Sequence, residues 1–208
     1  MMRRSLLRGL LVTLPALSAG LPAQADALHS LSVFVREVKS GRASFTQTVT
    51  APDSGRAKLS RGHFEFLRPN RFRFVYTQPF EQSIVADGGK VWIYDVDLNQ
   101  ASSRKLAQAL GGTPAALLAG GDLERDFVLQ AEAPLGGLEW VRATPRTADT
   151  GFKSVRVGFR GSELAALEIV DSFGQRSRLD FSDFVANVPL APEAFRFVPP
   201  AGADIIEQ

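Results

Sequence analysis

The stretch from Arg68 to Gln100 constrains the fold more than any other part of the chain. Within it the large apolar side chains Phe72, Phe74 and Tyr76 alternate with polar ones. A period close to two is typical of a β-strand with one apolar face. Pro and Gly interrupt the stretch at short intervals, so it predicts several short strands and no long helix.

The same alternation recurs along the rest of the chain. It predicts strands at residues 43–49, 62–67, 71–77, 82–86, 90–94, 126–130, 138–144, 152–159, 163–170, 176–181 and 195–198. Asp87-Gly88-Gly89 is typical of a tight hairpin turn between two of them. The early runs are too short and too closely spaced for crossover helices, so we expect an antiparallel meander.

Helical patterns occur in two places. The first begins after residue 25 and has apolar residues at helical spacing, namely Leu28, Leu31, Val35 and Val38. This pattern predicts an amphipathic helix, which we expect Gly41 to close. Two short helices are predicted at residues 102–110 and 113–119, the second with Thr113 as N-cap and Pro114 at its first position.

Together these patterns predict a mainly β fold with a helical lid. We expect a single strongly curved antiparallel sheet, because such a sheet has an apolar concave face that must be covered. The N-terminal helix and the short inserted helices are the candidates to cover it. The sequence shows no repeat, low-complexity tract or domain boundary after the first residues.

The first 25 residues have the features of a cleaved secretory signal. A basic start with Arg3, Arg4 and Arg8 precedes an apolar run, and Ala23-Gln24-Ala25 has the small residues that signal peptidase requires. The apolar run is shorter than the roughly 20 residues that span a membrane. We therefore predict a signal peptide at residues 1–25 and one domain outside the cytoplasm at residues 26–208. The Arg3-Arg4 pair leaves Sec and twin-arginine export open.

Charge and cysteine content narrow the class further. Removal of the signal takes away three of the 24 basic residues and none of the 22 acidic ones, which leaves a net charge of −1. That balance argues neither for nucleic acid nor for an anionic membrane surface as a partner, and we predict no nucleic-acid partner. With no Cys, the chain has no disulfides and no residue to carry a lipid anchor.

The sequence offers little catalytic chemistry. It contains no G-x-S-x-G motif and no thiolate, and its two histidines, His29 and His63, lack metal-ligand spacing. We therefore predict that the protein is no enzyme and has no cofactor or metal. What remains is a large set of apolar side chains, which form either an ordinary core or the wall of a cavity for an apolar ligand. Periodicity does not distinguish the two.

Several segments in order along the chain resemble the periplasmic outer-membrane lipoprotein carriers of the LolA type. The matching segments are ASFTQ at 43–47, RPNRFRFVY at 68–76, VADG at 85–88, VWIYDVDLNQ at 91–100, ALGGTPAALLAG at 109–120, DSFGQ at 171–175 and FRFVPPAGADII at 195–206. They cover nearly all of the chain after residue 25.

The resemblance implies an unclosed β-barrel whose mouth is covered by helices and whose apolar cavity receives the acyl chains of a lipoprotein. The cavity residues implied are Phe45, Phe64, Phe66, Phe72, Phe74, Trp92, Leu117 and Leu118. It also implies a monomeric carrier that accepts acylated lipoproteins from an inner-membrane ATP-driven (ABC) transporter and delivers them to an outer-membrane receptor.

Arg68 looks like the family's latch arginine, which hydrogen-bonds the lid backbone and holds the cavity shut without cargo. Its planar fork suits this role because it satisfies several helix-end carbonyls at once. The alternative is a surface arginine at a strand edge. Phe72 also matches a position linked in the family to loading from the transporter. Phe74 stands where some members have Trp, and some carriers continue beyond the C-terminal Pro199-Pro200 turn into a further closing segment.

Two alternative functions stay open. One is a half-barrel of the same class that carries another lipid or glycolipid, or that senses stray lipoproteins. The other is an enzyme that acts on acyl chains, with a Ser or Thr beside His29 or His63 as nucleophile and base.

Overall fold

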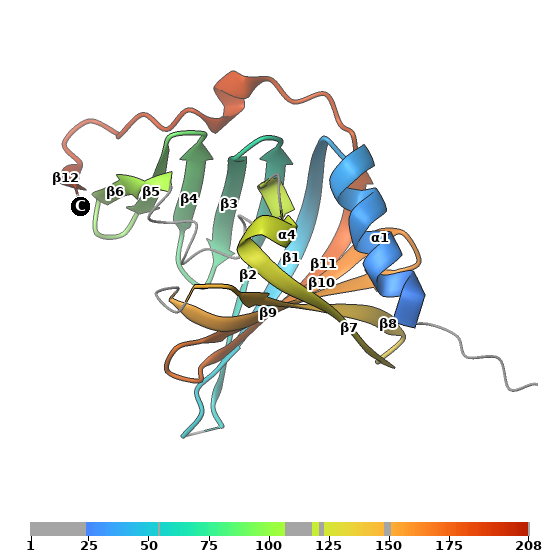
Figure 1. Cartoon of the computed structure of the whole chain (residues 1–208). Coiled ribbons are helices and arrows are strands. Elements are labelled where there is room, and N and C mark those ends of the chain that lie inside the picture. The colour runs from blue at the N-terminus through green and yellow to red at the C-terminus, as the bar shows by residue number, and fades with distance from the viewer. Residues whose placement is uncertain (1–23, 54, 107–117, 121–122, 148–150, 208) are drawn as a thin grey trace, which may run out of the picture.

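A single 12-stranded sheet makes up most of the computed structural model, which describes residues 24–53, 55–106, 118–120, 123–147 and 151–207 (Figure 1). The strands are β1 Ser40–Thr50, β2 Ala57–Leu67, β3 Arg71–Gln78, β4 Gln82–Asp87, β5 Lys90–Asp95, β6 Gln100–Lys105, β7 Phe127–Leu135, β8 Leu138–Pro145, β9 Phe152–Arg160, β10 Glu163–Asp171, β11 Arg176–Ala186 and β12 Asp204–Glu207. The helices are α1 Gln24–Glu37, α4 Leu123–Asp126 and the 3₁₀ helix η1 Pro192–Phe195.

The strand order shows how the sheet is assembled. It runs β12-β6-β5-β4-β3-β2-β1-β11-β10-β9-β8-β7, so β1 joins two meanders. Phe45 in β1 lies opposite Gly62 of β2 on one side and Phe181 of β11 on the other. The sheet curls strongly and does not close, since β12 and β7 form its two edges (Figure 1). The predicted unclosed, mainly β architecture is confirmed.

The N-terminal helix lies on the concave side of the sheet. Its apolar residues pack on β7, β8 and β9. The helix ends at Glu37, and Gly41 belongs to β1, so the prediction that Gly41 closes the helix was wrong. A Cβ at Gly41 would lie 2.6 Å from the ring of Phe66, which explains the glycine as a site of close packing.

The inserted region differs from the prediction at its start. Residues 102–105 were predicted to be helical but form β6, paired with β5 on one side and β12 on the other. Strand pairing overrides the helix propensity of Arg104 and Lys105 there. Leu118 and Ala119 have helical backbone as predicted, whereas Thr113, Pro114 and Leu117 lie outside the described residues. The described part of the chain contains no helix with both the length and the apolar character needed to cross a membrane.

The C-terminal segment covers the outer face of β3 to β5. Residues 195–198 were predicted to be a strand, but η1 ends at Phe195 and the chain continues without sheet pairing to β12. Phe195 is fully buried, η1 packs on β3 and β4, and Phe197 contacts the rings of Trp92 and Tyr94. β12 then pairs with β6 in parallel, an exception to the predicted antiparallel pattern.

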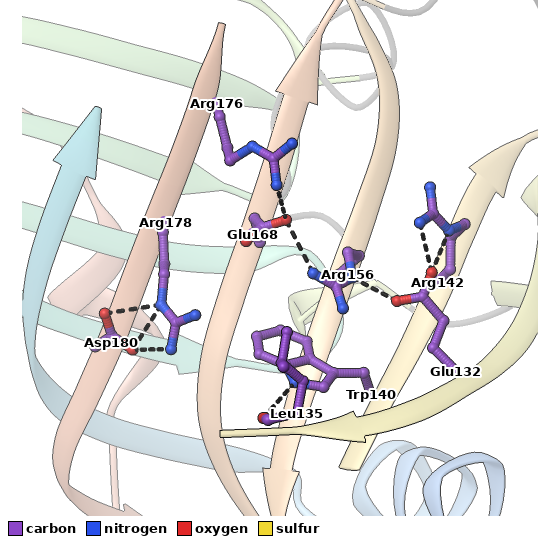
Figure 2. A network of polar contacts seen from close by, with 9 residues as sticks. All are labelled: Glu132, Leu135, Trp140, Arg142, Arg156, Glu168, Arg176, Arg178 and Asp180. Carbon is purple, nitrogen blue, oxygen red and sulfur yellow. Dashed lines mark hydrogen bonds and ion pairs between the residues drawn. The ribbon is translucent and has the colours of Figure 1, made fainter. Parts of the chain in front are cut away.

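An ionic network covers the outer face of β7 to β11 (Figure 2). The carboxylate of Glu168 lies 3.1 Å from Arg156 and 3.2 Å from Arg176, and Arg156 also pairs with Glu132. Desolvation raises the pKa of the Glu132 carboxyl, but hydrogen bonds from Arg142 and Arg156 outweigh it and hold that pKa below its usual value. The network ties these five neighbouring strands together from outside.

Candidate functional site

An aromatic cluster fills the concave side of β1 to β3. Side chains on one face of these strands point inward because residues alternate across a strand. The rings of Phe64 and Phe74 stack with centroids 4.4 Å apart, and Phe45 meets Phe74 edge-on at 5.6 Å. Aromatic pairs at such distances add about 0.5–1.5 kcal/mol each to the free energy of burial.

The structure places the predicted cavity residues as follows. Phe45, Phe64, Phe66, Phe72, Phe74 and Leu118 are all buried in this one cluster. Leu117 lies outside the described residues. The prediction for Trp92 was wrong: its neighbour Val91 belongs to the cluster, whereas Trp92 contacts Phe197 on the opposite face of the sheet.

Arg68 lies at the end of β2, between the N-terminal helix and the inserted segment. Its Nε donates a 2.9 Å hydrogen bond to the carbonyl of Val38, just beyond the end of α1, and its Nη1 donates to the carbonyl of Gly120. Backbone contacts flank these bonds, since Arg68 N donates to Lys39 O and Asn70 N donates to Ala119 O, each at 2.8 Å. The guanidinium therefore bridges two covering segments that are far apart in sequence.

The surroundings of the Arg68 guanidinium are apolar. The group lies 5.5 Å from the ring centroids of both Phe34 and Phe66, which is cation–π distance. Burial lowers the pKa of Arg68 from its ordinary value to about 10, so the group remains a cation at neutral pH. Its Nη2 is buried and, within the described part of the chain, has no hydrogen-bond partner.

Sequence reasoning missed Phe34 as a site residue. Phe34 is fully buried, and its ring lies within 6.0 Å of the ring centroids of Phe66, Phe159 and Phe184. It therefore links α1 to both meanders of the sheet, through Phe66 in β2 and through Phe159 and Phe184 in β9 and β11. It also forms one wall of the Arg68 site. Its place on the apolar face of the first helix, three residues after Leu31, was the available signal.

Two hollows adjoin the cluster. One, of about 490 Å³, lies between α1, α4 and β7, where Leu31, Val35 and Leu129 contribute to its wall. The other, of about 850 Å³, lies at the opposite end of β3 from Arg68, where Tyr76 faces it. Burial raises the pKa of the Tyr76 hydroxyl to about 12.

The two histidines lie apart from this site. His29 is exposed on α1, and His63 is exposed on β2. Across the residues described, neither forms a hydrogen bond with a Ser or Thr hydroxyl, and no group of three or more His, Asp or Glu side chains is arranged to hold a metal ion.

Comparison with known proteins identifies the family. The profile of the outer membrane lipoprotein carrier protein LolA matches residues 36–198. This chain belongs to the LolA family. It is 60% identical over 192 residues to an outer-membrane lipoprotein carrier protein of Methylibium petroleiphilum, with 92% of this chain and 94% of that protein covered. It is 58% identical over 186 residues to one of Leptothrix cholodnii, with coverage of 89% and 88%.

Solved structures support the LolA-family fold. A LolA superfamily protein from Nitrosomonas europaea superposes with a TM-score of 0.50 at 15% identity and covers 85% of this chain and 98% of its own. A lipoprotein-sorting protein domain from Vibrio parahaemolyticus gives 0.51 at 10% identity, with coverage of 83% and 95%. At these identities the likeness concerns the fold alone.

Proposed function

We propose that this LolA-family chain is a periplasmic carrier that holds the acyl chains of lipoproteins against the aromatic cluster. The observation that carries the proposal is the cluster on the concave face, closed by Arg68 bonds to segments on either side. In this scheme, cargo is loaded from an inner-membrane ABC transporter and delivered to an outer-membrane receptor. The carrier names of relatives with up to 60% identity support this role.

The energetics suit a binding protein that opens and closes. Transfer of acyl chains out of water is favourable by about 0.8 kcal/mol per CH₂ group, so lipoproteins do not leave a membrane unaided. A carrier must bind the acyl chains nearly as favourably as the membrane does and must still release them. Hydrogen bonds from Arg68 to two backbone carbonyls supply a modest bias toward the closed state, which bound cargo must overcome.

A photo-crosslinker at position 74 tests the cargo class. Phe74 is buried in the cluster, whereas Arg61 lies exposed on β2 and serves as the matched control position. We expect acylated lipoproteins crosslinked at position 74 and absent at position 61, identified by mass spectrometry after purification from the periplasm. Free lipid or glycolipid at position 74 would favour the alternative cargo, and no crosslink at either site would make the cluster an ordinary core.

The latch role of Arg68 predicts a specific defect. Arg68→Leu removes both side-chain bonds, so the covering segments should separate more easily, and we expect more cargo to be bound and less to be released to the receptor. Arg71→Leu, in the adjacent β3, is the control and should behave as wild type. Normal loading together with normal transfer by Arg68→Leu would contradict the latch.

A further inference from the structure

The unpartnered Nη2 of Arg68 is a donor without an acceptor. Nε and Nη1 each have a carbonyl partner, but Nη2 is buried and has no partner among the residues that the structure describes. A buried donor that lacks a partner destabilises the folded state, and native structures retain few of them. Such a group indicates either strain or a place for an absent acceptor.

The charge of the guanidinium is also uncompensated. Both acceptors of Arg68 are neutral carbonyls, and none of the ion pairs within the described ranges involves it. Besides these carbonyls, the rings of Phe34 and Phe66 flank it, with their centroids 5.5 Å from the guanidinium carbon. The Arg68 side chain is partly buried, and a cation removed from water in this way normally has an anionic partner, because desolvation of an isolated charge is costly.

The arrangement of the donors shows what such a partner would meet. The bond from Nε to Val38 holds the guanidinium from the α1 side, independently of the bond from Nη1 to Gly120. If the Gly120 segment moves away, Nη1 and Nη2 become free together, on the same edge of the group. Two parallel N–H donors are the geometry that binds a carboxylate or a phosphate in bidentate fashion.

We propose that Arg68 binds the anionic head group of a single-chain amphiphile whose alkyl chain enters the aromatic cluster, and that this binding replaces the bond to Gly120. The inference rests on the proposed function, because it uses the same apolar site. It adds that the latch recognises charge. An anionic head group opens the cover by taking its donor, whereas a neutral amphiphile must open the cover without that gain.

Laurate, lauryl phosphate and lauryl alcohol test the proposal, since they share one alkyl chain and differ in head group. By titration calorimetry, we expect wild type to bind at least one anionic probe about tenfold more tightly than the alcohol. The more tightly bound anion identifies the head group as carboxylate or phosphate. In Arg68→Gln the ratio of the affinity for the anionic probe to that for the alcohol should fall to about one. Arg71→Gln should retain the wild-type ratio.

A spectroscopic measurement on wild type avoids dependence on the variant's stability. We expect the side-chain N–H resonances of Arg68, assigned by their absence in Arg68→Lys, to shift with the preferred anion and not with the alcohol. Equal affinities of wild type for all three probes, or a preference retained in Arg68→Gln, would overturn this inference and leave the carrier role intact. Failure of wild type to bind any probe would count against the apolar site of the proposed function itself.

Discussion

Gly62 has tighter surroundings than the other two glycines within the described strands, Gly41 in β1 and Gly158 in β9. A Cβ at this position would lie 2.0 Å from the backbone oxygen of Val75 and 2.9 Å from the ring of Phe45. The oxygen belongs to β3, so relief requires β2 and β3 to separate. The need for glycine therefore arises from the sheet backbone and from the aromatic cluster together.

We expect Gly62→Ala to lower the free energy of unfolding by about 3 kcal/mol, at the upper end for overpacking. Gly158→Ala is the comparison, because the three atoms nearest to its Cβ would all belong to side chains, the ring of Trp140 at 3.0 Å and Leu138 Cδ1 at 3.2 Å. A side chain yields more easily than the backbone of a strand. Urea unfolding of both variants measures the difference. A smaller loss for Gly62→Ala than for Gly158→Ala would contradict the packing argument.

Tyr76 makes stability depend on pH in the alkaline range. Its pKa is raised by burial from 10.0 to about 12, so between these values the folded state retains a proton that the unfolded state loses. The contribution of Tyr76 is thus fully present below pH 10.0 and is lost as the pH rises toward 12. Arg68, with its lowered pKa, acts in the opposite direction in the same range.

The difference between wild type and Tyr76→Phe isolates this effect, because Arg68 is common to both. Urea unfolding at a series of alkaline pH values should show wild type losing stability relative to Tyr76→Phe above pH 10.0. Parallel curves for the two proteins would show that Tyr76 titrates normally.

Among the elements, β10 owes part of its attachment to Glu168. This carboxylate is only 6% exposed and lies between Arg156 and Arg176 (Figure 2). Arg178 and Asp180 form a pair within β11 that is 38% and 49% exposed. Buried and exposed ion pairs differ in what the loss of one partner costs in stability. The remaining charge of a buried pair is left without a partner and without solvent, whereas that of an exposed pair is solvated.

We therefore expect Glu168→Ala to destabilise the protein by roughly 2 kcal/mol and Asp180→Ala by less than about 1 kcal/mol. High salt should reduce the smaller loss further and leave the larger one nearly unchanged. Urea unfolding at low and high salt provides both values. Equal losses for the two variants would show that burial of Glu168 contributes nothing.

Element by element, the sequence was most informative where side chains alternate. The strand with Phe72 and Phe74, β3, and its neighbour β4 were predicted to within one residue, because an apolar face and a polar face leave a period-two pattern. The other neighbour, β2, was predicted from residue 62 but begins at Ala57. β6 was missed because its polar residues carry no such pattern and are held by β5 and β12. Phe195 and Phe197 imitate a strand, yet they belong to a segment that packs on the face of the sheet.

The candidate site was partly predictable for the same reason. Alternation placed Phe45, Phe64 and Phe74 on one face, and the structure brings them together. It could not tell which face Trp92 would join, because both faces of β5 are covered by apolar groups, the outer one by Phe197. The environment of Arg68 depends on Val38 and Gly120, whose carbonyls leave no mark in the sequence.

At the scale of the whole molecule, one sheet contains both meanders, which β1 joins. This connection predicts that the protein unfolds as a single cooperative unit. The chain has two tryptophans, Trp92 in β5 and Trp140 in β8, one in each meander. We expect Trp92→Phe and Trp140→Phe, each leaving one fluorescent reporter, to have coincident urea transitions by fluorescence and circular dichroism. Transitions by the two probes that separate within either variant would indicate two domains in residues 26–208.

The position of β1 also determines at what point during synthesis or export the sheet can finish folding. β1 is among the first strands of the chain, but one of its two neighbours is β11, and the bond from Gln47 to Ser177 spans 130 residues. Pairings this distant in sequence form slowly, because a long loop must close first. A chain that emerges from the ribosome or from a translocation pore N-terminus first therefore cannot finish its sheet until nearly all of it has emerged, and until then β1 has one unpaired edge.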